Sequence, residues 1–236
     1  MGVTLGRRGG LVLAGLAGLT GLVFVICGLG LLGPRQVPVG PEGGAEEPLP
    51  APSPVERIPP EQRGVAEWVV IGAREEVERS TIYDASYVAI GYPGGDVPLG
   101  RGACTDVVVR AFRKAGIDLQ VLIHEDMRRN FKAYPQLWGL KGPDPNIDHR
   151  RVQNQMCFFE RHGATLTLSV APAARAEWRW GDVVYWRFPG GQLHCGIVSD
   201  RVGRSGLPLV IHNAGLAQEE DCLDRWEIIG HFRYPR

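Results

Sequence analysis

The sequence lacks a net charge, because its 26 Lys and Arg residues are balanced by 26 Asp and Glu residues. Nucleic-acid-binding domains carry an excess of basic residues, so no nucleic-acid partner is expected. The sequence also lacks an internal repeat and the tight His-Glu-x-x-His spacing of many zinc enzymes. We therefore predict an activity that needs no metal and no cofactor.

The five cysteines do not form an evident disulfide framework. Cys27 lies in an apolar segment, and Cys104 is better used as a free thiolate. The remaining three, Cys157, Cys195 and Cys222, are an odd number, and Cys195 suits a small buried position within a strand. A Cys157–Cys222 disulfide stays open, but nothing in the sequence requires it.

The N-terminal segment lacks charge over the 25 residues from Gly9 to Gly33, with Arg7 and Arg8 before it. Such a length crosses the hydrocarbon core of a bilayer as a helix. An Ala-x-Ala-like cleavage site is missing, so residues 1–33 are interpreted as a membrane anchor, with a cleaved signal as the alternative. The positive-inside rule places the rest of the chain in the periplasm or extracytoplasmic space, anchored to the inner membrane or secreted after cleavage.

Residues 34–62 contain nine prolines and five glutamates but few large apolar side chains. Such a composition favours an extended linker, which here would hold a domain away from the membrane. The remaining residues, 63–236, are predicted to form one domain.

Within this domain, apolar spacing predicts helices first and strands afterwards. Helices are expected over 65–78, 104–115, 124–131 and 151–162, and strands over 182–187, 194–200, 207–212 and 228–234. This order predicts an α+β fold, with N-terminal helices packed on an antiparallel β-meander.

Three residues suggest a thiol-based site. Cys104 opens a helix, where unpaired backbone N–H groups lower a thiol pKa and can receive an oxyanion. His194 begins one predicted strand, and His212 ends the next, so the two are expected to be neighbours. Gly196, two residues after His194 on the same face, would leave room for a helix end or a substrate. The plain alternatives are a buried cysteine and solvent-exposed histidines at strand edges.

Several motifs resemble known families. Gly102-Ala-Cys-Thr-Asp-Val-Val-Val-Arg110, Trp180-Gly-Asp-Val-Val-Tyr-Trp186 and His194-Cys-Gly-Ile-Val198 resemble the nucleophile helix and strands of the papain-like, NlpC-type cysteine peptidases of peptidoglycan. Tyr92-Pro-Gly-Gly-Asp-Val-Pro98, His124-Glu-Asp-Met127 and Pro143-Asp-Pro-Asn-Ile-Asp-His-Arg-Arg151 resemble the bacterial family catalogued as domain of unknown function 1287.

The resemblance implies roles for individual residues. Cys104 would be the nucleophile, His194 the general base and then acid, and His212 the group that orients His194. Tyr92, twelve residues before Cys104, would line the oxyanion site. Thr105-Asp106 departs from the usual Ser-Gly and places a carboxylate beside the nucleophile.

Further candidate substrate contacts are Asp106 itself, Asn213 after His212, and His149 and Arg150 in the long segment between the two halves of the motif. Arginine matches carboxylates such as those of muropeptides. The alternative for His149 and Arg150 is a solvated or internally paired surface loop.

The function expected is an extracytoplasmic cysteine amidase or endopeptidase, a hydrolase that cleaves peptidoglycan peptides through a thioester. Acyl transfer on the same triad stays open, as does a non-catalytic cell-envelope binding module. A zinc site of His149, His194 and His212 with Asp148 or Cys195 is a weaker alternative. The expected partners are peptidoglycan or another cell-envelope amide substrate, and the membrane through the N-terminal helix. The protein is expected to be a monomer.

Overall fold

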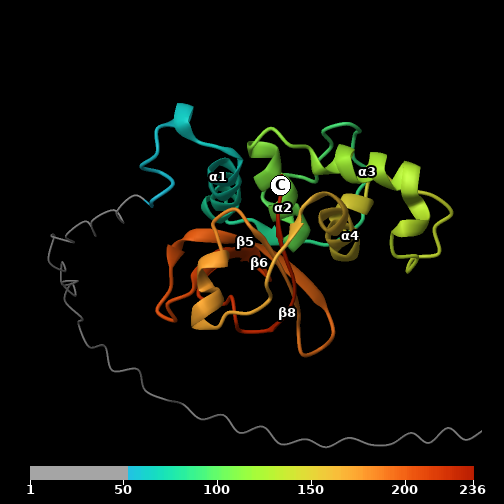
Figure 1. Cartoon of the computed structure of the whole chain (residues 1–236). Coiled ribbons are helices and arrows are strands. Elements are labelled where there is room, and N and C mark those ends of the chain that lie inside the picture. Colours follow the sequence, from blue (N-terminus) through green and yellow to red (C-terminus); the bar gives the residue numbers. More distant parts are fainter. Residues whose placement is uncertain (1–52) are drawn as a thin grey trace, which may run out of the picture. The chain divides into compact units, whose positions relative to one another are not determined.

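The computed structural model describes residues 53–236 (Figure 1). These residues form the α+β fold expected from the order of helices and strands. The predicted membrane segment and Cys27 lie outside the described residues. Within residues 53–236, no helix is both long and apolar enough to cross a membrane.

The helices come first along the chain and lie together on one side of the main sheet (Figure 1). They are α1 (Val65–Glu78), α2 (Cys104–Lys114), α3 (Leu119–Asn130) and α4 (Val152–His162), with the 3₁₀ turns η1 (Pro60–Gln62), η2 (Phe131–Ala133) and η3 (Asp148–Arg150). A further 3₁₀ turn, η4 (Pro172–Glu177), comes later in the chain and is not part of this group. Acidic side chains cap the N-termini of α1 and α3. Glu67 accepts the Gly64 N–H at 2.9 Å before α1, and Asp118 accepts the Gln120 N–H at 2.9 Å before α3.

The main sheet is antiparallel and has six strands in the order β3-β8-β4-β5-β6-β7. Its strands are β3 (Ala164–Thr165), β4 (Val183–Arg187), β5 (Leu193–Val202), β6 (Pro208–Asn213), β7 (Ala217–Glu220) and β8 (Glu227–Arg233). A separate parallel pair joins β1 (Ile82–Tyr83) to β2 (Arg101–Gly102).

The sheet departs from the predicted meander in one respect. Strands β4 to β7 do follow one another, but β8 crosses back to pair with β4 on the other side. The short strand β7, whose sequence is Ala-Gln-Glu-Glu, carries no apolar alternation and exists because it pairs with β6. Pairing of this kind cannot be read from local sequence.

Two cores lie on opposite faces of the sheet. Between helices and sheet pack, among others, Val108, Phe112 and Phe159 with Ile197 and Ile211. The opposite core is built from other buried residues: Trp178, Val184, Trp186, Val198, Leu207, Val210, Cys222 and Leu223. Cys104 and Cys195 belong to the helix-facing core, so the start of α2 packs directly on β5.

The folded unit begins earlier than the predicted boundary at residue 63. Val55 is fully buried, and its N–H donates to Asp200 at 2.8 Å. Arg74 on α1 donates to the same carboxylate at 2.6 Å and to the Ser53 hydroxyl at 3.1 Å. The last ten residues of the predicted linker, 53–62, are therefore part of the domain.

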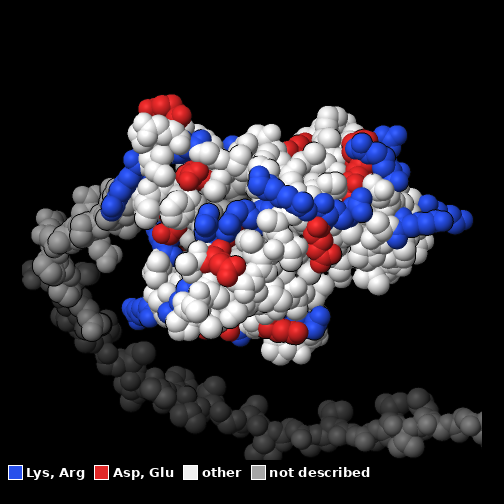
Figure 2. Space-filling view, viewed as in Figure 1, with Lys and Arg blue, Asp and Glu red and all other residues white. Residues whose placement is uncertain are grey.

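Charged residues of both signs are mixed over the surface. On the face shown in Figure 2, Lys and Arg lie among Asp and Glu. This arrangement agrees with the absence of net charge in the sequence.

Candidate functional site

Cys104 is the first residue of α2, and the local sequence explains why the helix starts there. The residue before it, Ala103, has no side chain that can cap a helix. Asp106 in the first turn supplies the cap instead, because its carboxylate accepts the Ala103 N–H at 2.6 Å. Cys104 is 4% exposed and lies where the backbone N–H groups of the helix start point outward.

His194 and His212 meet on neighbouring strands. The His194 Nε2 lies 2.9 Å from the His212 Nδ1, and both side chains are buried. His194 also lies close enough to Cys104 to lower the pKa of its thiol. The structure thus brings Cys104, His194 and His212 together in the order thiol, imidazole, imidazole.

The pKa of the Cys104 thiol is lowered to about 5, first by a hydrogen bond from the Cys195 thiol. A hydrogen bond from His194 and its positive charge lower this pKa further, against the opposing effect of burial. Burial first, and then the adjacent Cys104, raise the pKa of Cys195 well above its usual value. Burial lowers the pKa of His212 to about 3, with His194 and Arg225 adding to the effect. At neutral pH, Cys104 is therefore a thiolate, and His212 is a neutral imidazole.

Alkylation should single out Cys104. Iodoacetamide at pH 7 is expected to modify it faster than Cys157, Cys195 or Cys222, because burial raises the thiol pKa of each of these, that of Cys222 to about 12. The thiolate of Cys104 exists above its lowered pKa and is lost as the pH falls through it. Its labelling rate should stay nearly constant from pH 8 to 6 and fall below about pH 5. Peptide mass spectrometry measures this, and equal labelling of the four thiols would remove the case for an activated cysteine.

Gly196 allows the two histidines to approach each other and does not make room for a substrate. It lies opposite His212 in the β5–β6 register. A Cβ at this position would come within 2.7 Å of the Val210 side chain and 3.0 Å of the His212 Cβ. The absence of a side chain therefore allows β6 to bring His212 close to His194.

Asp106 and Arg150 form a buried ion pair next to the nucleophile. The Arg150 guanidinium donates to both Asp106 oxygens, at 2.8 and 2.9 Å, and both side chains are almost fully buried. The Thr105 hydroxyl donates to the Arg150 carbonyl at 2.9 Å. The Thr105-Asp106 departure from the usual pattern thus anchors the long segment between the motif halves. Arg150 is thus paired with Asp106, and its side chain is 2% exposed.

Removing Arg150 should destabilise the fold strongly. Arg150→Ala leaves the Asp106 carboxylate buried without its partner, which costs roughly 3–5 kcal/mol of unfolding free energy. Arg187→Ala is the matched control, because Arg187 and Glu227 form an ion pair with both side chains at least half exposed. Such a pair contributes about 1 kcal/mol or less. Urea denaturation compares the two variants, and equal losses would contradict the structural role of Arg150.

Tyr92 does not lie where the resemblance places it. Its hydroxyl donates to Glu125 at 2.9 Å, and its ring packs on His124 of α3 at 4.9 Å. Tyr83 lies near the thiol instead, because β1 pairs with β2 and sets Tyr83 opposite Gly102. Burial, and then the negative charge of Cys104, raise the pKa of Tyr83. No local pattern marks Tyr83, since only the pairing of β1 with β2 brings it to the site.

Asn213 and His149 are buried and have structural contacts. The Asn213 side chain donates to the Thr81 carbonyl at 3.1 Å and to the Gly102 carbonyl at 3.0 Å, which fixes the approach to Cys104. The pKa of His149 is lowered to about 4, first by burial. Its Nδ1 has no hydrogen-bond partner, and the charged groups around it are Asp106, Arg150, Asp118 and Arg113. Neither side chain is exposed to a substrate.

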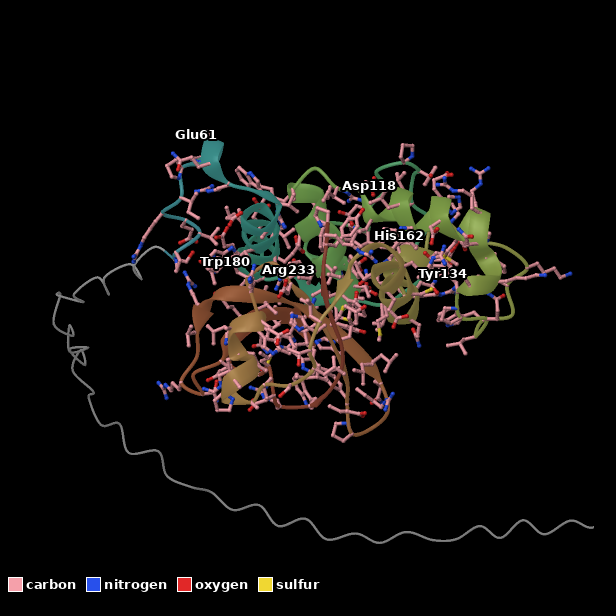
Figure 3. All side chains as sticks on the ribbon, in the orientation of Figure 1. Glu61, Asp118, Tyr134, His162, Trp180 and Arg233 are labelled. Carbon is pink, nitrogen blue, oxygen red and sulfur yellow. The ribbon has the colours of Figure 1, made fainter. Side chains whose placement is uncertain are left out.

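Two other buried carboxylates have all their oxygens paired. Asp126 accepts from Tyr134 at 2.7 Å and from Arg161 at 2.7 and 3.1 Å, and it lies 3.2 Å from His162. Asp182 accepts from Arg233 and lies 2.9 Å from His231. Tyr134, His162 and Arg233 are labelled in Figure 3. These clusters are satisfied internally and show no reactive group.

Aromatic side chains enclose the histidines on the side away from the helices. The Trp186 ring stacks on His194 at 5.8 Å, and the Phe188 ring lies 4.9 Å from it. Phe188 and Trp226 also line an open depression of about 360 Å³, with Arg187 and Arg225 at its edge. Sequence reasoning missed this depression, because its walls come from the β4–β5 turn and from the segment before β8.

The described residues therefore define an α+β protein with a buried cysteine–histidine–histidine cluster at the junction of helices and sheet. A family model described as domain of unknown function (DUF1287) matches residues 70–234, and the chain belongs to this family. It is also 52% identical over 164 residues to the uncharacterized protein YijF of Escherichia coli strain K12. That alignment covers 69% of this chain and 78% of the relative.

Proposed function

We propose that this protein is a cysteine hydrolase of the papain-like, NlpC type that cleaves amide bonds in peptidoglycan peptides. The observation that carries the proposal is the Cys104–His194–His212 arrangement, in which the thiol has a pKa lowered by the nearby His194 imidazole and the His212 imidazole lies 2.9 Å from His194. Thiol amidases require this chemistry: an activated nucleophile, a base beside it, and a group that orients the base.

The proposed reaction begins with attack of the Cys104 thiolate on the amide carbonyl. The oxyanion that forms is stabilised by backbone N–H groups at the start of α2 and by the Tyr83 hydroxyl, which takes the part first given to Tyr92. The His194 imidazolium then gives its proton to the leaving amine, and a thioester remains on Cys104. His194 next takes a proton from water, and the hydroxide releases the acid and restores the thiolate.

His212 acts through His194. Because its Nδ1 faces the His194 Nε2, a neutral His212 with its proton on Nε2 accepts a hydrogen bond from His194. This bond fixes the His194 ring with its Nδ1 toward Cys104. It also stabilises the imidazolium, as the third residue of a catalytic triad does.

The depression beside His194 supports a substrate with an apolar group. Phe188 and Trp226 in its lining suit such a group. Arg187 and Arg225 are ion-paired with Glu227 and Glu220, so a substrate carboxylate would have to take the place of these partners. Peptidoglycan peptides carry several carboxylates. Arg187 and Arg225 are more accessible for this role than Arg150, because their side chains are 50% and 46% exposed.

The proposed location is extracytoplasmic, with residues 1–33 as a membrane anchor and the domain close to the cell wall. The proposal rests on the uncharged 25-residue segment and the arginines before it. A phosphatase reporter fused after Arg236 should be active. A reporter that is fluorescent only in the cytoplasm should be dark at the same position, and the reverse result would overturn this topology.

The proposed activity is tested by incubating the purified full-length protein with peptidoglycan and analysing the released fragments by mass spectrometry. Hydrolysis adds one water to each cleaved bond, whereas acyl transfer yields fragments that carry a new acceptor. Fragments should appear with the wild type and not with Cys104→Ala. Intact peptidoglycan in both samples, over a range of pH and substrates, would overturn the proposal.

A further inference from the structure

Three side chains of the metal-binding type meet on the far side of His212 from His194. They are His212 on β6, Glu220 at the end of β7 and Cys222 just after it. One ligand atom of each lies within 4.8 Å of the other two. The His212 Nε2 lies 3.7 Å from the Glu220 Oε1. Pairing of β6 with β7 creates this cluster.

A second observation points to a ligand at this place. The His212 Nε2 is buried and has no hydrogen-bond partner, although the His212 side chain is almost completely enclosed. A buried polar atom without a partner is costly, and native proteins rarely leave one without a reason. Glu220 is 22% exposed at its side chain and connects the cluster to solvent. An ion therefore has a route to the buried nitrogen.

We propose that His212, Glu220 and Cys222 form a binding site for a divalent transition metal, with zinc the best match. Imidazole, carboxylate and thiolate are the ligand types of zinc sites. Zinc bonds of about 2.0–2.3 Å set ligand atoms roughly 3.5 Å apart, so the cluster must contract by about 1 Å. Arg225 is paired with Glu220 Oε1, the same oxygen that approaches His212, so a metal must displace Arg225 from this oxygen or bind Oε2 after the Glu220 side chain turns. On binding, Cys222 loses its proton to solvent, and water fills the fourth position.

Metal binding and the triad would make opposite demands on His212. A metal at Nε2 leaves the ring proton on Nδ1, where it is donated to the His194 Nε2. The proposed hydrolase needs the reverse, a proton on the His212 Nε2 and a free Nδ1 that accepts from His194. Bound metal therefore switches the triad off. This regulatory step rests on the proposed function, whereas the metal site does not.

The site is tested by zinc titration of full-length Cys104→Ala protein in a calorimeter. The substitution removes Cys104 as a competing ligand. We expect one zinc ion per chain. Adding Glu220→Gln or Cys222→Ala should weaken binding by more than about 100-fold, because even outer-shell changes cost 10- to 100-fold. Glu227→Gln and Cys157→Ala are the matched controls and should bind as Cys104→Ala does.

Cobalt gives a direct readout of the thiolate ligand. The Cys104→Ala protein should show a thiolate-to-cobalt charge-transfer band that Cys222→Ala removes. Circular dichroism checks that each variant is folded, and Glu220→Gln keeps both the size and the partial exposure of the side chain. Absence of zinc binding, or an affinity that neither Glu220→Gln nor Cys222→Ala changes, would overturn the site.

Regulation is tested with peptidoglycan cleavage as the readout. Zinc should inhibit the wild type, and Cys222→Ala should raise the concentration needed by the same factor as its loss of affinity. Equal inhibition of both would show that zinc acts at Cys104 and His194, and would overturn the regulatory step. Zinc binding by a protein that cleaves nothing would instead sink the proposed hydrolase and leave the metal site intact.

Discussion

The Cys104→Ala variant should lose peptidoglycan cleavage by a factor of about 10⁴ to 10⁶, the loss seen when a covalent nucleophile is removed. The reason is that no other described thiol takes its place. Cys195 is hydrogen-bonded to Cys104, but its own pKa is raised well above the usual value, first by burial. It therefore stays a neutral thiol at pH 7.

The measurement is the initial rate of fragment release from purified peptidoglycan. Cys157→Ala is the control, because Cys157 is also a free cysteine and lies on α4. It should keep the wild-type rate. A Cys104→Ala protein that works within tenfold of the wild type would exclude thioester catalysis.

The losses of activity caused by substituting His194 and His212 should not be additive. His194→Ala should abolish turnover, because the nucleophile loses the group that receives and returns its proton. His212→Ala should lower the rate of turnover less than His194→Ala does. His212→Asn should lower it less again, since an amide oxygen can accept the His194 N–H. Once His194 is gone, adding His212→Ala should cost almost nothing further, because His212 acts only through it.

The coupling is measured from the rates of fragment release by the wild type, His194→Ala, His212→Ala and the double variant. His124→Ala is the control, because that histidine lies on α3 against Tyr92 and not in the cluster. Wild-type-like activity in His194→Ala would refute the mechanism. If His212→Ala were as inactive as Cys104→Ala, the roles of the two histidines would have to be exchanged.

Local sequence predicted the four α-helices and four of the eight strands of the described residues, because their signals are local. The helix expected over 65–78 is confirmed at α1, and the helix expected over 151–162 is confirmed at α4. Four strands appear close to their predicted bounds. Strands β1, β2, β3 and β7 were missed because none has an apolar alternation. Each exists through pairing, β1 with β2, β3 with β8 and β7 with β6.

The site residues also fall into those that local sequence predicts and those that it does not. Cys104 could be chosen from the sequence because a helix start is a local signal, and His194 and His212 because they lie at the ends of successive strands. Tyr83, Cys195 and Glu220 could not be chosen, because they reach the site through pairings between distant segments. The position given to Tyr92 relied on its distance along the chain, and the structure places its ring on α3 instead.

The sequence by itself determined the residue types of the cluster, the class of fold and the start of the helix that carries the cysteine, since each depends on a few neighbouring residues. Only the tertiary structure decided which groups set their chemistry. Burial of Asp106 forces its pairing with Arg150, which gives that guanidinium an internal partner. The pairing of β5, β6 and β7 aims one nitrogen of His212 at His194 and the other at Glu220. These outcomes depend on desolvation and strand register, which residues far apart in the sequence determine together.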